Sequence, residues 1–89
     1  MTLACSAQVV DTRPAVVCEW SVPAGGAASY RLLRGVAGQP TGRVLTPAPG
    51  TRRVVDFDAA PGATYLYTAQ AVDSAGALLG SSNPVSLAR

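Results

Sequence analysis

The chain has 89 residues, which is enough for one domain with a single hydrophobic core. A hydrophobic fraction of 48% excludes a disordered chain, and a net charge of +2 is too small for a surface that tracks nucleic-acid phosphates. No apolar run approaches about 20 residues, so the sequence predicts no membrane insertion. We therefore expect one globular domain over residues 1–89, with neither nucleic acid nor a membrane span.

The basic residues are all arginine, in a chain rich in alanine, glycine, valine and proline. This usage is typical of a GC-rich genome. The first residues, Met1, Thr2 and Leu3, lack the basic segment and the long apolar core of a signal peptide. We expect Met1 to precede an excised domain, so that the chain is one module of a longer parent protein.

The first part of the chain predicts two neighbouring strands, over residues 2–10 and 15–22. Both stretches are rich in apolar residues, and turn formers at 11–14 separate them. Period-two alternation gives each strand an inward and an outward face. The residues expected on the inward faces are Leu3, Cys5, Ala7, Val9, Val16, Cys18 and Trp20.

Three further strands are predicted in the middle of the chain. Residues 29–34 alternate, with Tyr30 and Leu32 on one face. Residues 42–46 fit a short edge strand, and residues 51–57 fit another strand.

The clearest strand signal lies in residues 61–76. A Pro-Gly turn opens the stretch, and residues 64–72 then alternate, with Tyr65 and Tyr67 on one face. A tight turn follows, and residues 77–87 are expected to return as the partner strand. About seven short strands with no helical period predict an all-β fold, an antiparallel Greek-key sandwich. The side chains expected to form its core are Trp20, Tyr30, Leu32, Tyr65 and Tyr67.

Over nearly its whole length the chain resembles a fibronectin type III domain, which has an immunoglobulin-like sandwich fold. The family's buried tryptophan matches Trp20 in VVCEW, and its third-strand tyrosine, with an apolar residue two positions on, matches Tyr30 and Leu32. The most specific match runs from Asp56 through the Pro-Gly turn and Tyr65, the apparent tyrosine-corner residue. AVDSAG and SSNPV complete that match.

Two features depart from the family pattern. Ala59 stands where a leucine is usual, two residues before the turn proline, and cysteines stand where aliphatic side chains are usual. Members that look similar occur in bacterial secreted enzymes and surface proteins. The resemblance therefore implies an extracellular or cell-surface location in a bacterium.

Cys5 and Cys18 are the only cysteines, and both fall at expected inward positions of neighbouring strands. A disulfide between them would close a loop of about 14 residues, would stabilise the domain by about 3 kcal/mol, and would imply an oxidising compartment. The alternatives are two buried free thiols or a metal site, which the absence of histidine and of a CxxC motif disfavours.

The sequence predicts neither an enzyme nor a cofactor. Histidine and lysine are absent, and catalysis needs a positioned base or nucleophile. Asp56 and Asp58 have a spacing that is a weak signal for calcium. We expect these two carboxylates to be solvated in a loop or to pair with Arg52 or Arg53.

The sequence suggests two candidate surfaces for partners. Arg52 and Arg53, together with Arg31 and Arg34, form either a small basic patch or a solvated strand face. Leu33, Leu66 and Val72 are expected to point away from the core and to form an interaction surface with Arg31 and Arg52. Among the aromatic residues only Phe57 lacks an expected core position, so a stacking platform for sugars is disfavoured.

These inferences favour a non-catalytic extracellular module that acts as a spacer or interaction domain in a larger protein. Its partners would be the neighbouring domains of the parent chain. The alternative is a binding module for polysaccharide or for a protein, acting through the loops 24–28 and 36–41 or through the face of Leu33, Leu66 and Val72.

Overall fold

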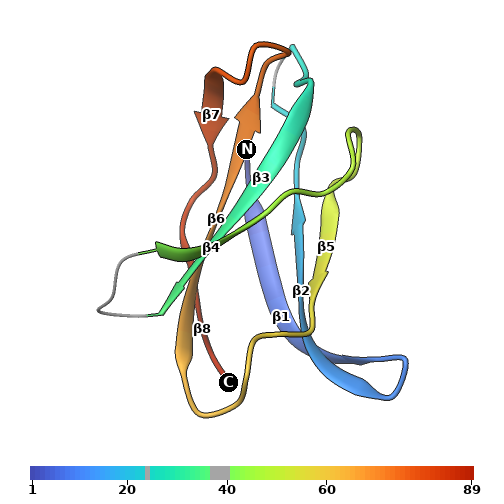
Figure 1. Ribbon diagram of the computed structural model, residues 1–89, viewed down its shortest axis with the longest axis vertical. Helices are drawn as coiled ribbons and strands as arrows, with labels where there is room; N and C mark the ends of the chain where they lie inside the picture. Colours follow the sequence, from blue (N-terminus) through green and yellow to red (C-terminus); the bar gives the residue numbers. More distant parts are fainter. Residues whose placement is uncertain (24, 37–40) are drawn as a thin grey trace.

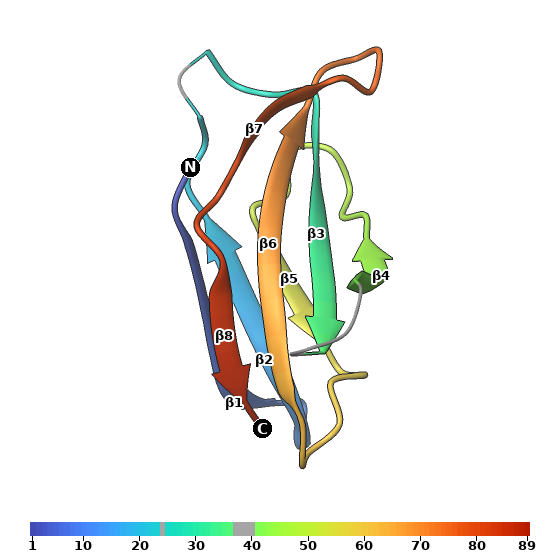
Figure 2. The ribbon, with the colours of Figure 1, turned by 90° about the vertical axis from the view of Figure 1, so that its left-hand side faces the viewer.

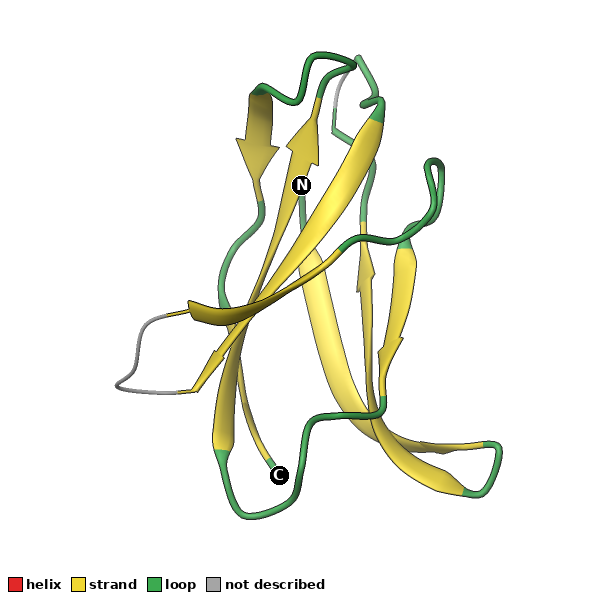
Figure 3. Ribbon diagram, in the orientation of Figure 1, coloured by secondary structure: helices red, strands yellow, loops and turns green. Residues whose placement is uncertain are grey.

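The structure is a computed structural model that describes residues 1–23, 25–36 and 41–89. The described residues form eight antiparallel strands in two sheets (Figure 1). In chain order the strands are β1 (Leu3–Val10), β2 (Arg13–Trp20), β3 (Ser29–Val36), β4 (Thr41–Leu45), β5 (Arg53–Asp56), β6 (Thr64–Val72), β7 (Leu78–Ser81) and β8 (Val85–Ala88). These residues contain no helix (Figure 3), and hence none long and apolar enough to cross a membrane.

The strands divide into a three-stranded sheet, in the order β1-β2-β5, and a five-stranded sheet. The larger sheet has the order β4-β3-β6-β7, and β8 pairs with the other half of β6. Figure 2 shows β6 crossing in front of β2, with the two sheets as separate layers. The fold is thus an all-β sandwich, as the alternating pattern predicts.

The core lies between the two layers and consists mainly of side chains from β2, β3 and β6. The rings of Trp20 and Tyr30 pack against each other across the layers, with centroids 5.6 Å apart and planes tilted by 54°. Leu32 and Tyr67 are fully buried beside them, and Tyr65 is 6% exposed. Ala59, where the family pattern has leucine, is also buried in this cluster.

The outer half of the β1–β2 hairpin corrects one prediction. Ala7 and Val9 were expected to face the core, but both are exposed, and Val9 retains 74% of its accessible surface. The hairpin extends past the opposite sheet (Figure 1), so no second layer covers these positions. Its tight turn places Asp11 and Thr12 at positive φ, as a two-residue hairpin of the I′ type requires.

The C-terminal strand is broken, where the sequence predicted one strand over 77–87. Ser82 leaves the ladder and exchanges hydrogen bonds with Ala69, and Pro84 has no N–H to donate. The side chain of Asn83 then accepts a hydrogen bond from Leu3 N–H and donates one to Leu3 C=O, at 3.0 and 3.2 Å. The break therefore attaches the larger sheet to β1 of the smaller sheet.

Candidate functional site

A disulfide joins Cys5 on β1 to Cys18 on β2, with a sequence separation of 13. The two residues are direct partners in the antiparallel register, and their Cα atoms are 4.1 Å apart. Cys18 is fully buried and Cys5 is half-buried. This confirms the disulfide among the alternatives that the sequence left open, and a disulfide is compatible with an extracellular location.

A buried carboxylate connects the two sheets. Asp56 at the end of β5 is 2% exposed, and its Oδ2 accepts a hydrogen bond from Arg34 Nη1 on β3 at 2.7 Å. The same oxygen accepts one from the Tyr67 hydroxyl on β6 at 3.1 Å, and Oδ1 accepts one from Asp58 N–H at 3.0 Å. We call Asp56, Arg34 and Tyr67 the inter-sheet network.

The surroundings of the inter-sheet network fix its protonation. Burial raises the pKa of Tyr67 well above the ordinary tyrosine value, and the negative charge of Asp56 raises it further. Burial acts to lower the pKa of Arg34, but the hydrogen bond and charge of Asp56 outweigh it, so that the pKa is raised. The network therefore keeps a proton on Tyr67 and a positive charge on Arg34.

Neither Asp56 nor Asp58 pairs with Arg52 or Arg53, so the pairing alternative is wrong, whereas Asp58 is exposed to solvent as the other alternative predicts and Asp56 is buried. Asp58 instead makes an ion pair with Arg43 Nη1 on β4 at 2.7 Å, in an exposed position. Each of the two carboxylates thus has a guanidinium partner on the larger sheet, at positions that the spacing of the acids alone does not reveal.

Tyr65 forms a second polar link at the start of β6. Its hydroxyl donates a hydrogen bond to the C=O of Ala60, five residues upstream, at 3.1 Å. Such a bond to the backbone just before the strand is the geometry of a tyrosine corner. It holds the chain between β5 and β6 against the end of the sandwich.

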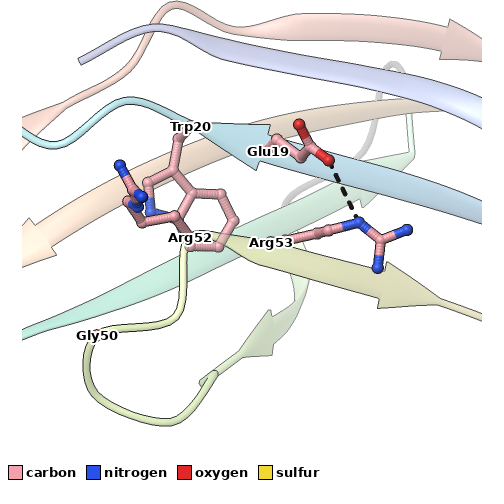
Figure 4. Close-up of a pocket in the computed structure, with 5 residues that line it drawn as sticks. All are labelled: Glu19, Trp20, Gly50, Arg52 and Arg53. Atoms are coloured by element: carbon pink, nitrogen blue, oxygen red, sulfur yellow. Dashed lines mark ion pairs between the residues drawn. The ribbon is translucent and has the colours of Figure 1, made fainter.

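An open surface pocket of about 490 Å³ lies at the free edge of the smaller sheet (Figure 4). It is lined by Glu19, Trp20, Gly50, Arg52 and Arg53. The turn that leads into β5 supplies one wall of the pocket. In this turn the N–H of Thr51 donates a hydrogen bond to the C=O of Ala48 at 3.0 Å, and Gly50 has φ +83°. Proline at the second and glycine at the third position are typical of a type II turn.

The charged groups of this pocket lie on both sides of the β5 edge. Arg53 Nε is 3.2 Å from Glu19 Oε1, its register partner on β2, and both side chains are more than half exposed. The backbone N–H of Trp20 donates a hydrogen bond to the C=O of Arg52 at 3.1 Å, which holds the end of β2 beside the residue that precedes β5. The guanidinium groups of Arg52 and Arg53 lie at opposite ends of the pocket (Figure 4).

Comparison with known proteins gives one informative similarity. The chain is similar to part of pectate lyase PelI from Erwinia chrysanthemi, in a crystal structure of its complex with tetragalacturonic acid. The TM-score is 0.70 and the identity 28%, over 96% of this chain but only 27% of the pectate lyase chain. No protein-family model and no curated protein matches the sequence.

The predicted interaction residues do not form one surface. Leu33 and Leu66 lie on the outer face of the larger sheet, with Leu66 exposed and Leu33 half-buried. Arg31 shares that face but is half-buried, and Arg52 lies at the edge of the other sheet, where it is exposed. Of the loops proposed for binding, residues 24 and 37–40 lie outside the described residues.

Val72 was predicted to be part of this surface, but it is buried, with 5% exposure. It sits at the end of β6 with Ser29 of β3 on one side and Leu78 of β7 on the other. The pairing with β7 shifts register at this point, in a β-bulge. A bulge twists the strand locally, so simple alternation does not give the exposure of a residue beside it.

Sequence reasoning also missed the role of Arg34 as a partner inside the sandwich. Its position in the alternation was a usable signal, because Arg34 has the same parity as Tyr30 and Leu32, which face the core. A charged residue at an inward position needs a buried partner of opposite charge. The exposed Val44, the register partner of Leu33, was also not predicted, because nothing in the local pattern of β4 shows which residue of β3 lies opposite it.

Proposed function

We propose that the chain is a non-catalytic, fibronectin type III-like module of a larger bacterial secreted or surface protein, where it sets the distance and orientation of neighbouring domains. The observation that carries this proposal is the similarity to a stretch amounting to 27% of a pectate lyase chain. Nearly all of this chain matches, but it matches only about a quarter of the larger enzyme. This is the result expected for a module that is carried beside a catalytic domain.

Several structural features support membership of this fold family. The strand order β1-β2-β5 against β4-β3-β6-β7 is compatible with the Greek-key connection of immunoglobulin-like sandwiches. Trp20 packs in the core, and Tyr65 makes the tyrosine-corner hydrogen bond to Ala60.

The spacer role is supported by links that make the module resistant to deformation. The disulfide joins β1 to β2 within one sheet, and the inter-sheet network joins β5 to β3 and β6 across the layers. A stiff unit of this kind transmits orientation between its two ends. The disulfide also supports the proposed extracellular location.

A second candidate function is binding of an acidic polysaccharide, as an additional task of the same module. It is favoured by the arginine-containing pocket at the β5 edge. The pectate lyase to which the chain is similar forms a complex with tetragalacturonic acid, an acidic oligosaccharide. A module beside such an enzyme would hold it near its substrate.

Two assays on the purified domain test these proposals. Incubation with polygalacturonate, xylan or cellulose should release no new reducing ends, and release proportional to domain concentration would overturn the non-catalytic proposal. In a pull-down on the same glycans immobilised on beads, retention of the domain would overturn a pure-spacer role and support the binding function. Absence of retention on every glycan would leave the spacer role as the function.

A further inference from the structure

We propose that the pocket at the β5 edge binds the carboxylate groups of a uronic-acid oligosaccharide, with Arg52 and Arg53 as the recognition residues. This inference rests on the second candidate function, because it names the ligand class and the site of that binding. We call Arg52, Arg53, Glu19 and Trp20 the edge pocket.

The two arginines have the chemistry and the placement for carboxylates. Arg52 makes no ion pair with any other described residue, so its guanidinium is available to a ligand. Arg53 uses Nε toward Glu19, and its terminal nitrogens remain on the solvent side. A guanidinium presents a planar fork of donors that matches a carboxylate in a bidentate manner.

The separation of the two guanidinium groups favours an oligomer over a single acid. Arg52 directly precedes β5 and Arg53 is its first residue. Adjacent residues of an extended chain point in opposite directions, and Figure 4 shows these two side chains at opposite ends of the edge pocket. An oligouronate carries a carboxylate on each sugar, so that one chain lying across the strand end can meet both arginines.

Trp20 provides an independent indication of a ligand or bound water. It lines the pocket with a side chain that is only 4% exposed, and its indole Nε1 is buried with no acceptor among the described residues. An unsatisfied buried donor is costly. Because Nε1 has almost no accessible surface, an oxygen of a ligand in the pocket would satisfy it only after the indole ring turned toward the pocket.

The aromatic residues explain why the ligand should be acidic rather than neutral. Neutral sugars are generally held on exposed aromatic rings, but the core aromatics are buried between the sheets. Phe57, the remaining ring, is covered by the guanidinium of Arg13 at 4.2 Å from its centroid. Without a stacking platform, charge is the available means of recognition, and the edge pocket has two positive groups for one negative.

The test uses isothermal titration and ¹⁵N NMR of the whole 89-residue domain. The probes are tetragalacturonate and the neutral tetrasaccharide cellotetraose, at low and at high salt. Trp20 is the only tryptophan, so its single indole N–H resonance reports on the pocket without assignment work. The variants are Arg52→Gln and Arg53→Gln, with Arg43→Gln as the matched control, because Arg43 is an equally exposed arginine on the opposite sheet.

We expect tetragalacturonate to shift the indole resonance and to bind more weakly at high salt, and cellotetraose to do neither. Each pocket variant should weaken tetragalacturonate binding about tenfold, because it loses one charge-assisted hydrogen-bonded pair. Arg43→Gln should change the affinity by less than about twofold. Thermal melts equal to wild type would show that the variants remain folded, as expected for exposed side chains.

Three outcomes would overturn the proposal. Tetragalacturonate binding that both pocket variants retain would place the site elsewhere, while the binding function itself would survive. Equal binding of cellotetraose, or equal competition by poly-L-glutamate, would show that uronic acids are not the ligand class. No binding of any probe would remove both this site and the second candidate function, and would leave the spacer role intact.

Discussion

Two ion pairs of the same length occupy very different places in this molecule. Arg34–Asp56 and Arg43–Asp58 each measure 2.7 Å between nitrogen and oxygen. The side chains of the first pair are 15% and 1% exposed, whereas those of the second are 46% and 57% exposed. Both carboxylates come from one short stretch at the end of β5, and both guanidinium groups come from the larger sheet.

The difference shows that distance alone does not give the contribution of an ion pair to stability. The exposed pair exchanges with water and is screened by salt, so its contribution is small. The buried pair has lost its hydration, and Asp56 accepts further hydrogen bonds from Tyr67 and from the backbone of Asp58. Removing one partner therefore leaves a buried charge that nothing else in the network compensates.

The largest effect is expected for Asp56→Asn. The side chain keeps its shape but loses the charge opposite Arg34, so the free energy of unfolding should fall by about 3–5 kcal/mol. Urea unfolding followed by tryptophan fluorescence measures this change. The double variant Arg34→Leu with Asp56→Leu is the control, and it should be less destabilised than Asp56→Asn because it leaves no unpaired charge. A loss below about 1 kcal/mol for Asp56→Asn would contradict the comparison.

The disulfide within the smaller sheet should contribute about as much to the free energy of unfolding as the inter-sheet network does. Replacing both Cys5 and Cys18 by alanine should lower the free energy of unfolding by about 3 kcal/mol, since the unfolded chain regains the entropy of an open loop. The same urea experiment measures it, and intact mass after alkylation without reduction verifies that the parent domain is oxidised. Two alkyl groups on the unreduced parent domain would contradict the disulfide.

A smaller effect is expected for Tyr67→Phe, which removes one donor from Asp56 and keeps the ring. The free energy of unfolding should fall by about 1–2 kcal/mol at neutral pH.

The same variant should also change the pH dependence of stability. The pKa of Tyr67 is raised in the folded state, chiefly by burial, whereas the unfolded tyrosine loses its proton near pH 10. Above about pH 10 the unfolded state therefore binds fewer protons than the folded state, and stability falls as pH rises. Wild type should lose more stability than Tyr67→Phe between pH 9 and about pH 11 in parallel urea titrations. Identical slopes for the two proteins would show that Tyr67 is not held protonated.

Much of the fold was predictable because alternation records which face of a strand is buried. The bounds of β6 follow directly from its pattern, and the pairing of Cys5 with Cys18 follows from neighbouring inward faces. The errors occur where burial depends on something other than the strand itself. Val9 is exposed because its hairpin extends past the second layer, and Val72 is buried beside a bulge.

The candidate sites were harder to predict, since they depend on which strands become neighbours in space. The sequence treats Asp56 and Asp58 alike, but β5 pairs at the free side of β2 and brings only Asp56 under Arg34 and Tyr67. The edge pocket likewise requires the end of β2, the turn at Gly50 and the start of β5 to meet. No local pattern in any one of these segments contains that information.

The exposed pair provides the opposite limit of the comparison. Asp58→Asn should change the free energy of unfolding by less than about 0.5 kcal/mol, because the pair is solvated and Arg43 remains hydrated without its partner. The small effect should shrink further in 1 M salt, where the screening length is about 3 Å, whereas the loss caused by Asp56→Asn should persist. If Asp58→Asn and Asp56→Asn instead lower the free energy of unfolding equally and respond equally to salt, then burial does not determine how much each ion pair contributes to stability. The stabilising role assigned to the inter-sheet network would then be wrong.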